Sequence, residues 1–290
     1  MKVLNYGSLN YDYVYKVDHI IMGGETENTY SLETHLGGKG FNQSVALSKA
    51  GLDVYHAGAL GEEGDMFLEA CREYNVNTEN IEIKPGKSGH TIIQIDKNAQ
   101  NSILLFGGAN RSQTKEHIDE VIAKFDKGDY IVLQNEVNYL GYIIDRAYEQ
   151  GMQVVLNPSP FDDALKECDF NKVSLFLLNE VEGEMMMGSK DPGAILDGFK
   201  EKYPDAKVVL TMGTDGAYYQ DKTGRYFQEA FKVKAVDTTA AGDTFTGYFI
   251  ASLAEGRDIQ SSLRRGAKAS SIAVTRDGAA ESVPYKDEVE

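Results

Sequence analysis

The stretch that decides the fold is Asp237–Gly247, "DTTAAGDTFTG", because it joins two segments of different hydrophobic period. Before it, "FKVKAVD" (residues 231–237) alternates apolar and polar residues, which is typical of a strand. After it, Phe245, Phe249 and Leu253 recur at four-residue spacing, which is typical of one face of a helix. The sequence therefore predicts a strand, a turn of small residues and a helix.

The turn at this predicted helix start has the composition of an anion site. The first N–H groups of a helix lack backbone partners and lie at the positive end of its dipole, and the small residues Ala240, Ala241 and Gly242 would let a phosphate approach them. Asp243 follows directly, where a carboxylate could act as general base for a hydroxyl that attacks phosphorus. Taken alone, Asp243 could equally be an aspartate that caps the helix.

Composition and charge limit the function classes. The chain has 290 residues, of which 42% are hydrophobic and 26% charged, as in a globular protein with one main core. Its net charge of −16 excludes a broad positive field, so we expect neither nucleic acid nor a membrane as a partner. The isolated Cys71 and Cys168 suit a reducing compartment. Because the N-terminus resembles a strand rather than a signal peptide, and no apolar run has transmembrane length, we expect a cytoplasmic protein.

The rest of the chain alternates strand-like and helix-like segments, which predicts an α/β fold with a mostly parallel central sheet. Two β segments interrupt this alternation. One lies between Ser8 and Leu36, and the other, "GHTIIQIDKNAQNSILLFGG" (residues 89–108), reads as two strands around a polar turn. We expect one domain over residues 1–290, with a small β-sheet lid formed by inserted segments at about 10–36 and 90–106.

Two glycine-containing motifs connect the chain to a known family. "GGKGFNQS" (Gly37–Ser44) and "DTTAAGDTFTG" resemble the two signatures of the ribokinase branch of the PfkB carbohydrate kinase family. "GSLNYD", "GGAN", "LLNEVEGE", "TMGTDGAYY" and "AVTRDGAAESVP" occur in the order that this branch shows. The resemblance implies a ribokinase-like three-layer α/β/α sandwich that uses ATP and Mg²⁺ to phosphorylate a sugar hydroxyl. It requires no Walker loop, and "LGGKGF" lacks the spacing of one.

The resemblance also assigns the catalytic and sugar-binding residues. It implies that Asp243 is the catalytic base and that the backbone of Ala240, Ala241 and Gly242 forms the anion hole for the phosphoryl group. It implies sugar-hydroxyl contacts from polar side chains and glycines at Asn10, Asp12, Gly38, Lys39, Asn42, Glu136 and Asp243. Without the resemblance, a "GGKG" segment would more often be a tight turn with a solvated lysine.

For the nucleotide, the resemblance implies contacts from Asn179, Glu182, Thr211, Gly213, Gly216 and Gly242. Asn179 and Glu182 would act near the Mg²⁺ through water, because Mg²⁺ gives up its water ligands reluctantly. A monovalent-cation site for K⁺ is implied at Asp237, Thr239, Ala273, Arg276, Gly278 and Ser282. Taken alone, the segments that carry these residues would be ordinary turns and loops.

Two positions depart from the family pattern, and the identity of the substrate stays open. Phe41 stands where an alanine is common, and Thr91 adds a hydroxyl where apolar residues usually surround the sugar, as Ile93 and Leu105 do. The resemblance implies that the 5-hydroxyl of D-ribose is phosphorylated. The alternatives are another kinase of the family, acting on a nucleoside, deoxyribose, a hexose or a keto-deoxy sugar acid, or a non-catalytic sugar-binding regulator. The presence of Asp243 argues against the regulator.

A row of tyrosines raises the question of self-association. Tyr11, Tyr13 and Tyr15 alternate along one predicted lid strand, so they share one face of it. An aromatic face on the lid could form a homodimer surface or could simply pack the lid against the rest of the protein. The sequence leaves both interpretations open.

Overall fold

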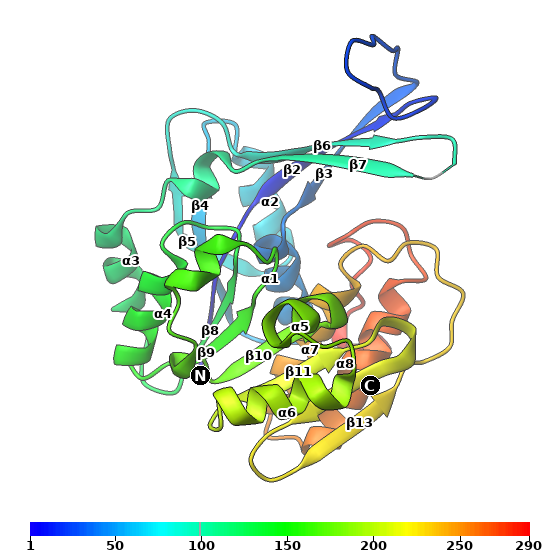
Figure 1. Cartoon of the computed structure of the whole chain (residues 1–290). Coiled ribbons are helices and arrows are strands. Elements are labelled where there is room, and N and C mark those ends of the chain that lie inside the picture. Colours follow the sequence, from blue (N-terminus) through cyan, green and yellow to red (C-terminus); the bar gives the residue numbers. More distant parts are fainter. Residues whose placement is uncertain (99) are drawn as a thin grey trace.

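The computed structural model describes residues 1–98 and 100–290, so Ala99, in the turn expected between two lid strands, lies outside the described residues. Its main sheet has nine strands in the order β13-β12-β11-β10-β9-β8-β1-β4-β5 (Figure 1). From β11 across to β5 the neighbouring strands are parallel, and β12 and β13 add an antiparallel edge. The strands are β1 (Val3–Tyr6), β4 (Val54–Leu60), β5 (Val76–Ile83), β8 (Tyr130–Gln134), β9 (Gln153–Asn157), β10 (Leu175–Asn179), β11 (Lys207–Thr211), β12 (Gly216–Gln220) and β13 (Arg225–Glu229).

Helices cover both faces of this sheet, which confirms the expected three layers. Side chains alternate between the faces of a strand, so Ile131 and Leu133 of β8 join one apolar cluster and Val132 joins another. The first cluster includes Ile118 and Ile143 from the helices on its side. The helices are α1 (Lys39–Lys49), α2 (Asp65–Glu73), α3 (Lys115–Ile122), α4 (Leu140–Glu149), α5 (Glu180–Met187), α6 (Pro192–Lys202), α7 (Ala241–Ala254), α8 (Ile259–Ala273) and α9 (Lys286–Val289), with 3₁₀ turns at Gly108–Arg111, Asp163–Glu167, Phe170–Lys172 and Gly213–Asp215. No helix in the described residues is long and apolar enough to cross a membrane.

A second, four-stranded sheet projects from the main body and is called the lid here (Figure 1). Its order is β3-β2-β6-β7, so each of the two predicted β segments supplies two strands. The chain enters the lid directly from β1, because only three residues separate β1 from β2. The lid strands are β2 (Asn10–Lys16), β3 (Ser31–Gly37), β6 (Gly89–Ile95) and β7 (Asn101–Phe106).

The pairing register gives the lid two distinct faces. Asp12 of β2 lies opposite Thr91 of β6, so these side chains share one face with Asn10. The other face carries Tyr11, which is buried and packs edge-on against Phe67 of α2 with a ring separation of 4.9 Å. The Tyr11 side chain therefore packs the lid against the main body. Of the two interpretations of the tyrosine row, this residue fits lid packing.

Helices α1 and α7 approach each other unusually closely. A Cβ on Gly247 of α7 would lie 2.5 Å from the Cβ of Ala46 on α1, a distance that real side chains do not tolerate. The missing side chain lets the two helices touch. Their N-terminal turns, which carry the glycine motif and Asp243, therefore lie side by side.

The strand predicted at residues 231–237 is wrong. The last strand before α7 is β13, and residues 230–237 form an irregular, largely exposed segment. The alternation of apolar residues has another cause, because Phe231 packs against the core while Val233 and Ala235 line a cavity. Alternation alone cannot distinguish these contacts from a strand.

Candidate active site

A cavity of about 230 Å³ lies at the carboxyl ends of the parallel strands. Asn157, Asn179 and Thr211, the last residues of β9, β10 and β11, line one side of it. Asp243 of α7 and Lys39 of α1 line the rest. This is the edge at which open α/β sheets place their ligands.

Asp243 lies in the first turn of α7, as the sequence predicts. Ala240 caps this helix in the left-handed conformation, with φ 57°, and its carbonyl accepts from Thr244 N at 2.8 Å. The N–H groups of Gly242 and Asp243 have no protein acceptor within the described residues, and both residues line the cavity. Residues 240–243 are called the anion turn here, because free donors and the helix dipole at this position favour a negatively charged ligand.

The Asp243 carboxylate is held by the glycine motif. It is 8% exposed, its Oδ1 accepts from Gln43 Nε2 at 2.8 Å, and its Oδ2 receives a longer contact of 3.4 Å from Asn42 Nδ2. Asn42 Oδ1 is buried without a partner in the described chain. The two motifs that the sequence separates by about two hundred residues thus form one site.

Lys39 supplies a positive charge to the same cavity. Burial lowers the pKa of Lys39, but the carboxylates of Asp243, Glu136 and Glu182 outweigh burial and raise it above its usual value. The ammonium group therefore keeps its charge in a partly dry site. A charged lysine beside a helix N-terminus suits a phosphoryl group.

Glu136 is fixed against the glycine motif. Its Oε2 accepts from Lys39 N at 2.9 Å and also from the hydroxyl of Ser8. Burial raises the pKa of the Glu136 carboxyl, and the hydrogen bond from Ser8 and the charge of Lys39 partly offset this. Gly38, the N-cap of α1, completes this corner of the site.

Asn10 and Asp12 stand at the base of the lid. Asn10 Oδ1 accepts from the buried Asn110 Nδ2 at 2.7 Å, so a neighbouring side chain fixes the amide of Asn10. Asp12 Oδ1 accepts from Thr91 Oγ1 at 2.5 Å. Burial raises the pKa of Asp12, and the Thr91 hydrogen bond and the charge of His35 act in the opposite direction. The hydroxyl that departs from the family pattern therefore orients the carboxylate predicted to bind the sugar.

Asn179 and Glu182 are tied together at the start of α5. Asn179 Oδ1 accepts from the N–H groups of Val181 and Glu182, and Glu182 Oε2 accepts from Asn179 N at 2.9 Å, which is a capping box. Glu182 Oε1 also accepts from Asn179 Nδ2 at 3.2 Å. Both residues line the small cavity, but their oxygens already accept hydrogen bonds, which suits contact with a hydrated cation better than direct ligation.

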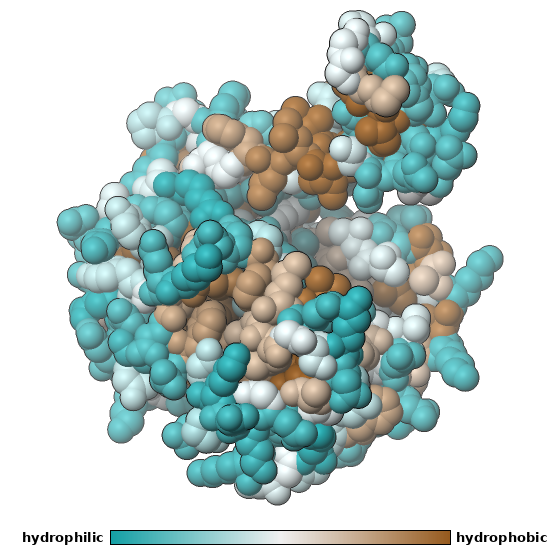
Figure 2. Space-filling model, in the orientation of Figure 1, coloured by the Kyte–Doolittle hydropathy of each residue, from teal (hydrophilic) through white to brown (hydrophobic). Residues whose placement is uncertain are grey.

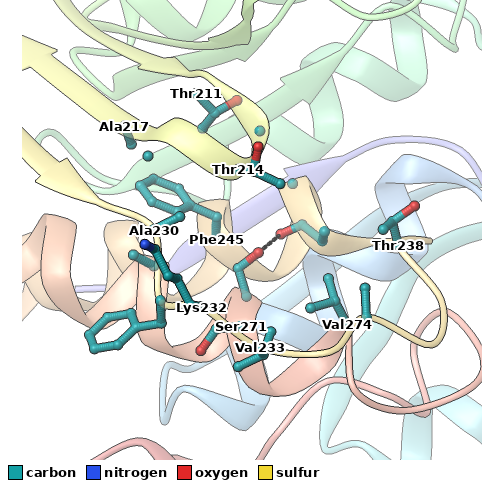
Figure 3. A pocket seen from close by; sticks show the side chains of 18 residues that line it. Thr211, Thr214, Ala217, Ala230, Lys232, Val233, Thr238, Phe245, Ser271 and Val274 are labelled. Carbon is teal, nitrogen blue, oxygen red and sulfur yellow. Dashed lines mark hydrogen bonds between the residues drawn. The ribbon is translucent and has the colours of Figure 1, made fainter.

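A larger cavity of about 600 Å³ adjoins the first, and the two share Thr211, Thr238, Ala241 and Gly242. Figure 3 shows that its walls come from the β11–β12 hairpin, from residues 230–238 and from α7 and α8. Ser270 Oγ donates to Ala241 O at 3.0 Å, the dashed line in Figure 3, and so fixes the anion turn to α8. The cavity is lined by the predicted Thr211, Gly213, Gly216 and Gly242 and by the unpredicted Ala217, Lys232, Val233, Phe245, Ser271 and Val274.

The segments predicted to hold a monovalent cation lie next to each other. The Asp237 carboxylate accepts from Thr239 N at 2.8 Å, from Thr239 Oγ1 at 2.6 Å and from Gly278 N at 3.2 Å. Burial raises the pKa of Asp237, but these hydrogen bonds outweigh burial and lower it. The Arg276 side chain pairs with Glu288, so only its backbone is available to a cation.

The remaining two residues predicted to bind the cation, Ala273 and Ser282, have oxygens that already take part in one hydrogen bond each. Ala273, the last residue of α8, accepts from Arg276 N at 3.0 Å through its carbonyl. The buried Ser282 hydroxyl donates to Ala279 O at 2.7 Å and keeps its own lone pairs. A carboxylate with neighbouring carbonyl and hydroxyl oxygens is a donor set that fits a hard monovalent cation.

Sequence reasoning missed two buried residues that orient the site. Gln43 holds Asp243, and Asn110 holds Asn10. Both stand inside the motifs "GGKGFNQS" and "GGAN", directly beside residues of interest. Their polar character within an otherwise buried segment was the available signal.

The chain is similar to known carbohydrate kinases along nearly its whole length. The pfkB family carbohydrate kinase profile matches residues 1–286. The chain is 32% identical over 299 residues to a ribokinase of Staphylococcus aureus, covering 99% of this chain and 98% of the relative. It is 30% identical over 296 residues to a deoxyribokinase of Salmonella typhimurium, covering 98% of this chain and 96% of the relative.

A solved structure is also similar over the whole chain. The ribokinase of Cryptococcus neoformans in complex with ADP superposes with a TM-score of 0.87 at 29% identity, covering 99% of this chain and 98% of that one. Fold and site together define an ATP-dependent sugar kinase. The chain belongs to the pfkB family of carbohydrate kinases.

Proposed function

We propose that this kinase transfers the γ-phosphoryl group of ATP to the 5-hydroxyl of D-ribose, with Asp243 as general base. The observation that carries the proposal is the position of Asp243 between the anion turn of α7 and the glycine motif that lies beside Asn10 and Asp12. Relatives named ribokinase support ribose, whereas the relative named deoxyribokinase keeps 2-deoxyribose as the nearest alternative.

In the proposed reaction, the sugar oxygen attacks the γ-phosphorus while its proton passes to the Asp243 carboxylate. The bond from the γ-phosphorus to the bridging oxygen breaks, and ADP leaves with the electron pair. The free N–H groups of the α7 turn and the Lys39 ammonium stabilise the negative charge of the transferring group. Mg²⁺, when bound with ATP, would neutralise phosphate charge, and Asn179 and Glu182 would hold it through water.

A coupled assay of ADP release tests both substrate and base. Wild-type protein should release ADP faster with D-ribose than with 2-deoxyribose, hexoses, keto-deoxy sugar acids or nucleosides. Asp243→Asn should keep ATP binding but lower turnover about 100-fold or more, because the amide cannot take the proton. Near-normal turnover in this variant contradicts the assignment of Asp243 as general base. A faster rate with another acceptor would make that acceptor the proposed substrate in place of ribose.

Asp12 tests the position of the sugar. Asp12→Ala should raise the KM for the sugar roughly 10- to 100-fold, because hydrogen bonds to a charged group are lost, and change the KM for ATP little. Asp18→Ala is the control, since this lid carboxylate is exposed and pairs with Lys97. Hydrogen exchange in residues 10–37 and 89–106 should slow when the sugar binds. Equal sugar affinity in Asp12→Ala and wild type would place the substrate elsewhere.

We further propose a K⁺ site beside the anion turn, supported by the donor set around Asp237. A cation there would order residues 237–240, which lead into the anion turn, without touching the sugar. Turnover should rise when K⁺ replaces tetramethylammonium at constant ionic strength, and Asp237→Ala should remove this response. A flat K⁺ titration of the wild type rejects the site.

A homodimer through the lid is also proposed. Every residue of β7 is exposed, and its apolar Ile103, Leu104, Leu105 and Phe106 form part of the brown patch over β6 and β7 in Figure 2. As the edge strand of the lid, β7 also presents unpaired backbone groups. A second copy of the chain could cover both.

Light scattering tests this association. The protein in solution should have twice the mass of one chain. The double substitution Ile103→Lys and Leu104→Lys should lower this mass to that of one chain, because it places one charge on each of the two faces of β7. Met22→Lys, in an exposed lid loop, is the control. A wild-type protein with the mass of one chain at micromolar concentration contradicts the dimer.

The remaining predictions stay proposals. We propose that residues 1–290 work as a single kinase domain, supported by the apolar clusters that continue across both faces of the main sheet. We also propose a cytoplasmic location, supported by Cys71 and Cys168, which are both free thiols.

A further inference from the structure

A chain of buried amide hydrogen bonds runs behind Asp243. Asp243 Oδ1 accepts from Gln43 Nε2 at 2.8 Å, and Gln43 Oε1 accepts from Gln134 Nε2 at 2.7 Å. The same Gln134 nitrogen donates its second hydrogen to Asn5 Oδ1 at 3.0 Å. Gln43 is 1% exposed, and Gln134 and Asn5 are fully buried. Direct hydrogen bonds between side chains therefore connect the carboxylate to the interior of the protein.

The far end of this chain is anchored on α1. Asn5 Nδ2 donates to Gly40 O at 2.6 Å and to Ser44 Oγ at 2.8 Å. Ser44 Oγ also contacts His56 Nδ1 at 2.8 Å, and burial lowers the pKa of His56 to about 4. At neutral pH His56 therefore carries no charge, so none of the hydrogen-bonded side chains behind Asp243 is ionised.

The chain has a fixed direction. An ionised carboxylate only accepts, so Gln43 must present its NH₂ group to Asp243 and its carbonyl to Gln134. Gln134 then donates both hydrogens, and its Oε1 is left without a partner in the described chain. Gly7 leaves room for this oxygen, because a Cβ there would lie 2.2 Å from it. If any of these side-chain amides were rotated by about 180°, which exchanges its oxygen and nitrogen, two donors or two acceptors would face each other.

These bonds tie four elements of the fold together. Asp243 belongs to α7, Gln43 to α1, Gln134 to the end of β8 and Asn5 to β1. Of the two carboxylate oxygens of Asp243, Oδ1 accepts the hydrogen bond from the buried Gln43, whereas Oδ2 has only the 3.4 Å contact with Asn42. Oδ2 is therefore the oxygen available to a substrate.

We propose that Gln43 is a positioning residue for phosphoryl transfer: supported by Gln134 and Asn5, it fixes Asp243 through Oδ1 and reserves Oδ2 for the sugar proton. This inference rests on the proposed role of Asp243 as general base. Gln43 lines the smaller cavity beside Asp243, and in this proposal it acts through its hydrogen bond to that carboxylate. It restricts rotation of the carboxylate and stabilises its ionised form by donating a hydrogen bond.

A purely structural amide network would make a different prediction. Disrupting such a network would change the stability of the protein but would not shift the pH dependence of catalysis. The pH dependence of kcat separates the two roles, because its acid limb reports the ionisation of the base in the substrate complex. Loss of a donor raises the pKa of a carboxyl group, so the acid limb should move to higher pH.

The test uses Gln43→Met, which keeps the length of the side chain but removes the amide. At pH 7 kcat should fall roughly 10-fold, the acid limb should move up by about one pH unit, and the KM for ATP should change less than about twofold. Gln134→Met, which leaves the Gln43–Asp243 bond in place but removes its support, should move the limb in the same direction by less.

Gln113→Met is the matched control. Gln113 is also a buried glutamine, and its Oε1 accepts from Tyr6 Oη at 2.9 Å, outside both cavities. It should lose stability yet keep the wild-type pH profile. Thermal unfolding of all three variants monitors folding.

The outcomes are distinguishable. A wild-type acid limb in folded Gln43→Met overturns the positioning role even if stability falls. If Gln43→Met does not fold, Gln134→Met decides by the same criterion. If Asp243→Asn retains turnover, the proposed base is wrong. If Asp243→Asn is inactive and the acid limb of Gln43→Met is unchanged, only the positioning role is wrong.

Discussion

The close contact between α1 and α7 is the constraint on which the site depends. At Gly247 and Ala46 the helices are too close for another side chain, so neither can shift along the other freely. This contact brings the glycine motif of α1 next to the first turn of α7. The side chains proposed to bind the sugar and the anion turn lie at the same edge of the sheet for this reason, and the Gln43–Asp243 hydrogen bond joins the two motifs.

Charge in the site is arranged locally. The whole chain carries a net charge of −16, so its overall field repels ATP. Within the site, three carboxylates raise the pKa of Lys39, which leaves an excess of negative charge around one ammonium group. In the proposed function, the free N–H groups of the α7 turn, Lys39 and the cations that accompany the nucleotide would therefore hold it. This requirement favours a helix N-terminus, rather than a basic surface, as the proposed anion site.

The sequence predicted the parts of the site that depend on local pattern. Asp243 at a helix start and the helix after "GGKG" follow from spacing and composition, and the family resemblance added the roles. The prediction of a strand at residues 231–237 was wrong, because apolar residues also alternate in a loop whose alternate side chains contact a core and a cavity. The pairings of Gln43 with Gln134 and of Gln134 with Asn5 span 91 and 129 residues, and no local pattern encodes such contacts. They follow only from the order of strands in the sheet.

The segment from β1 into β2 shows how the lid and the proposed catalytic base share one support. Asn5 in β1 belongs to the amide chain behind Asp243, whereas Asn10 and Asp12 lie at the start of the lid. Between them, Ser8 donates to Glu136 and its carbonyl accepts from Phe41 N at 2.9 Å, so this segment is fixed to the glycine motif. The base of the lid is thus fixed to the body where the sugar is proposed to bind, and only its outer part extends from the body (Figure 1). In the proposed reaction, a lid built this way would exclude water from the phosphoryl group without moving the residues proposed to orient the hydroxyl, because those residues belong to the body as much as to the lid.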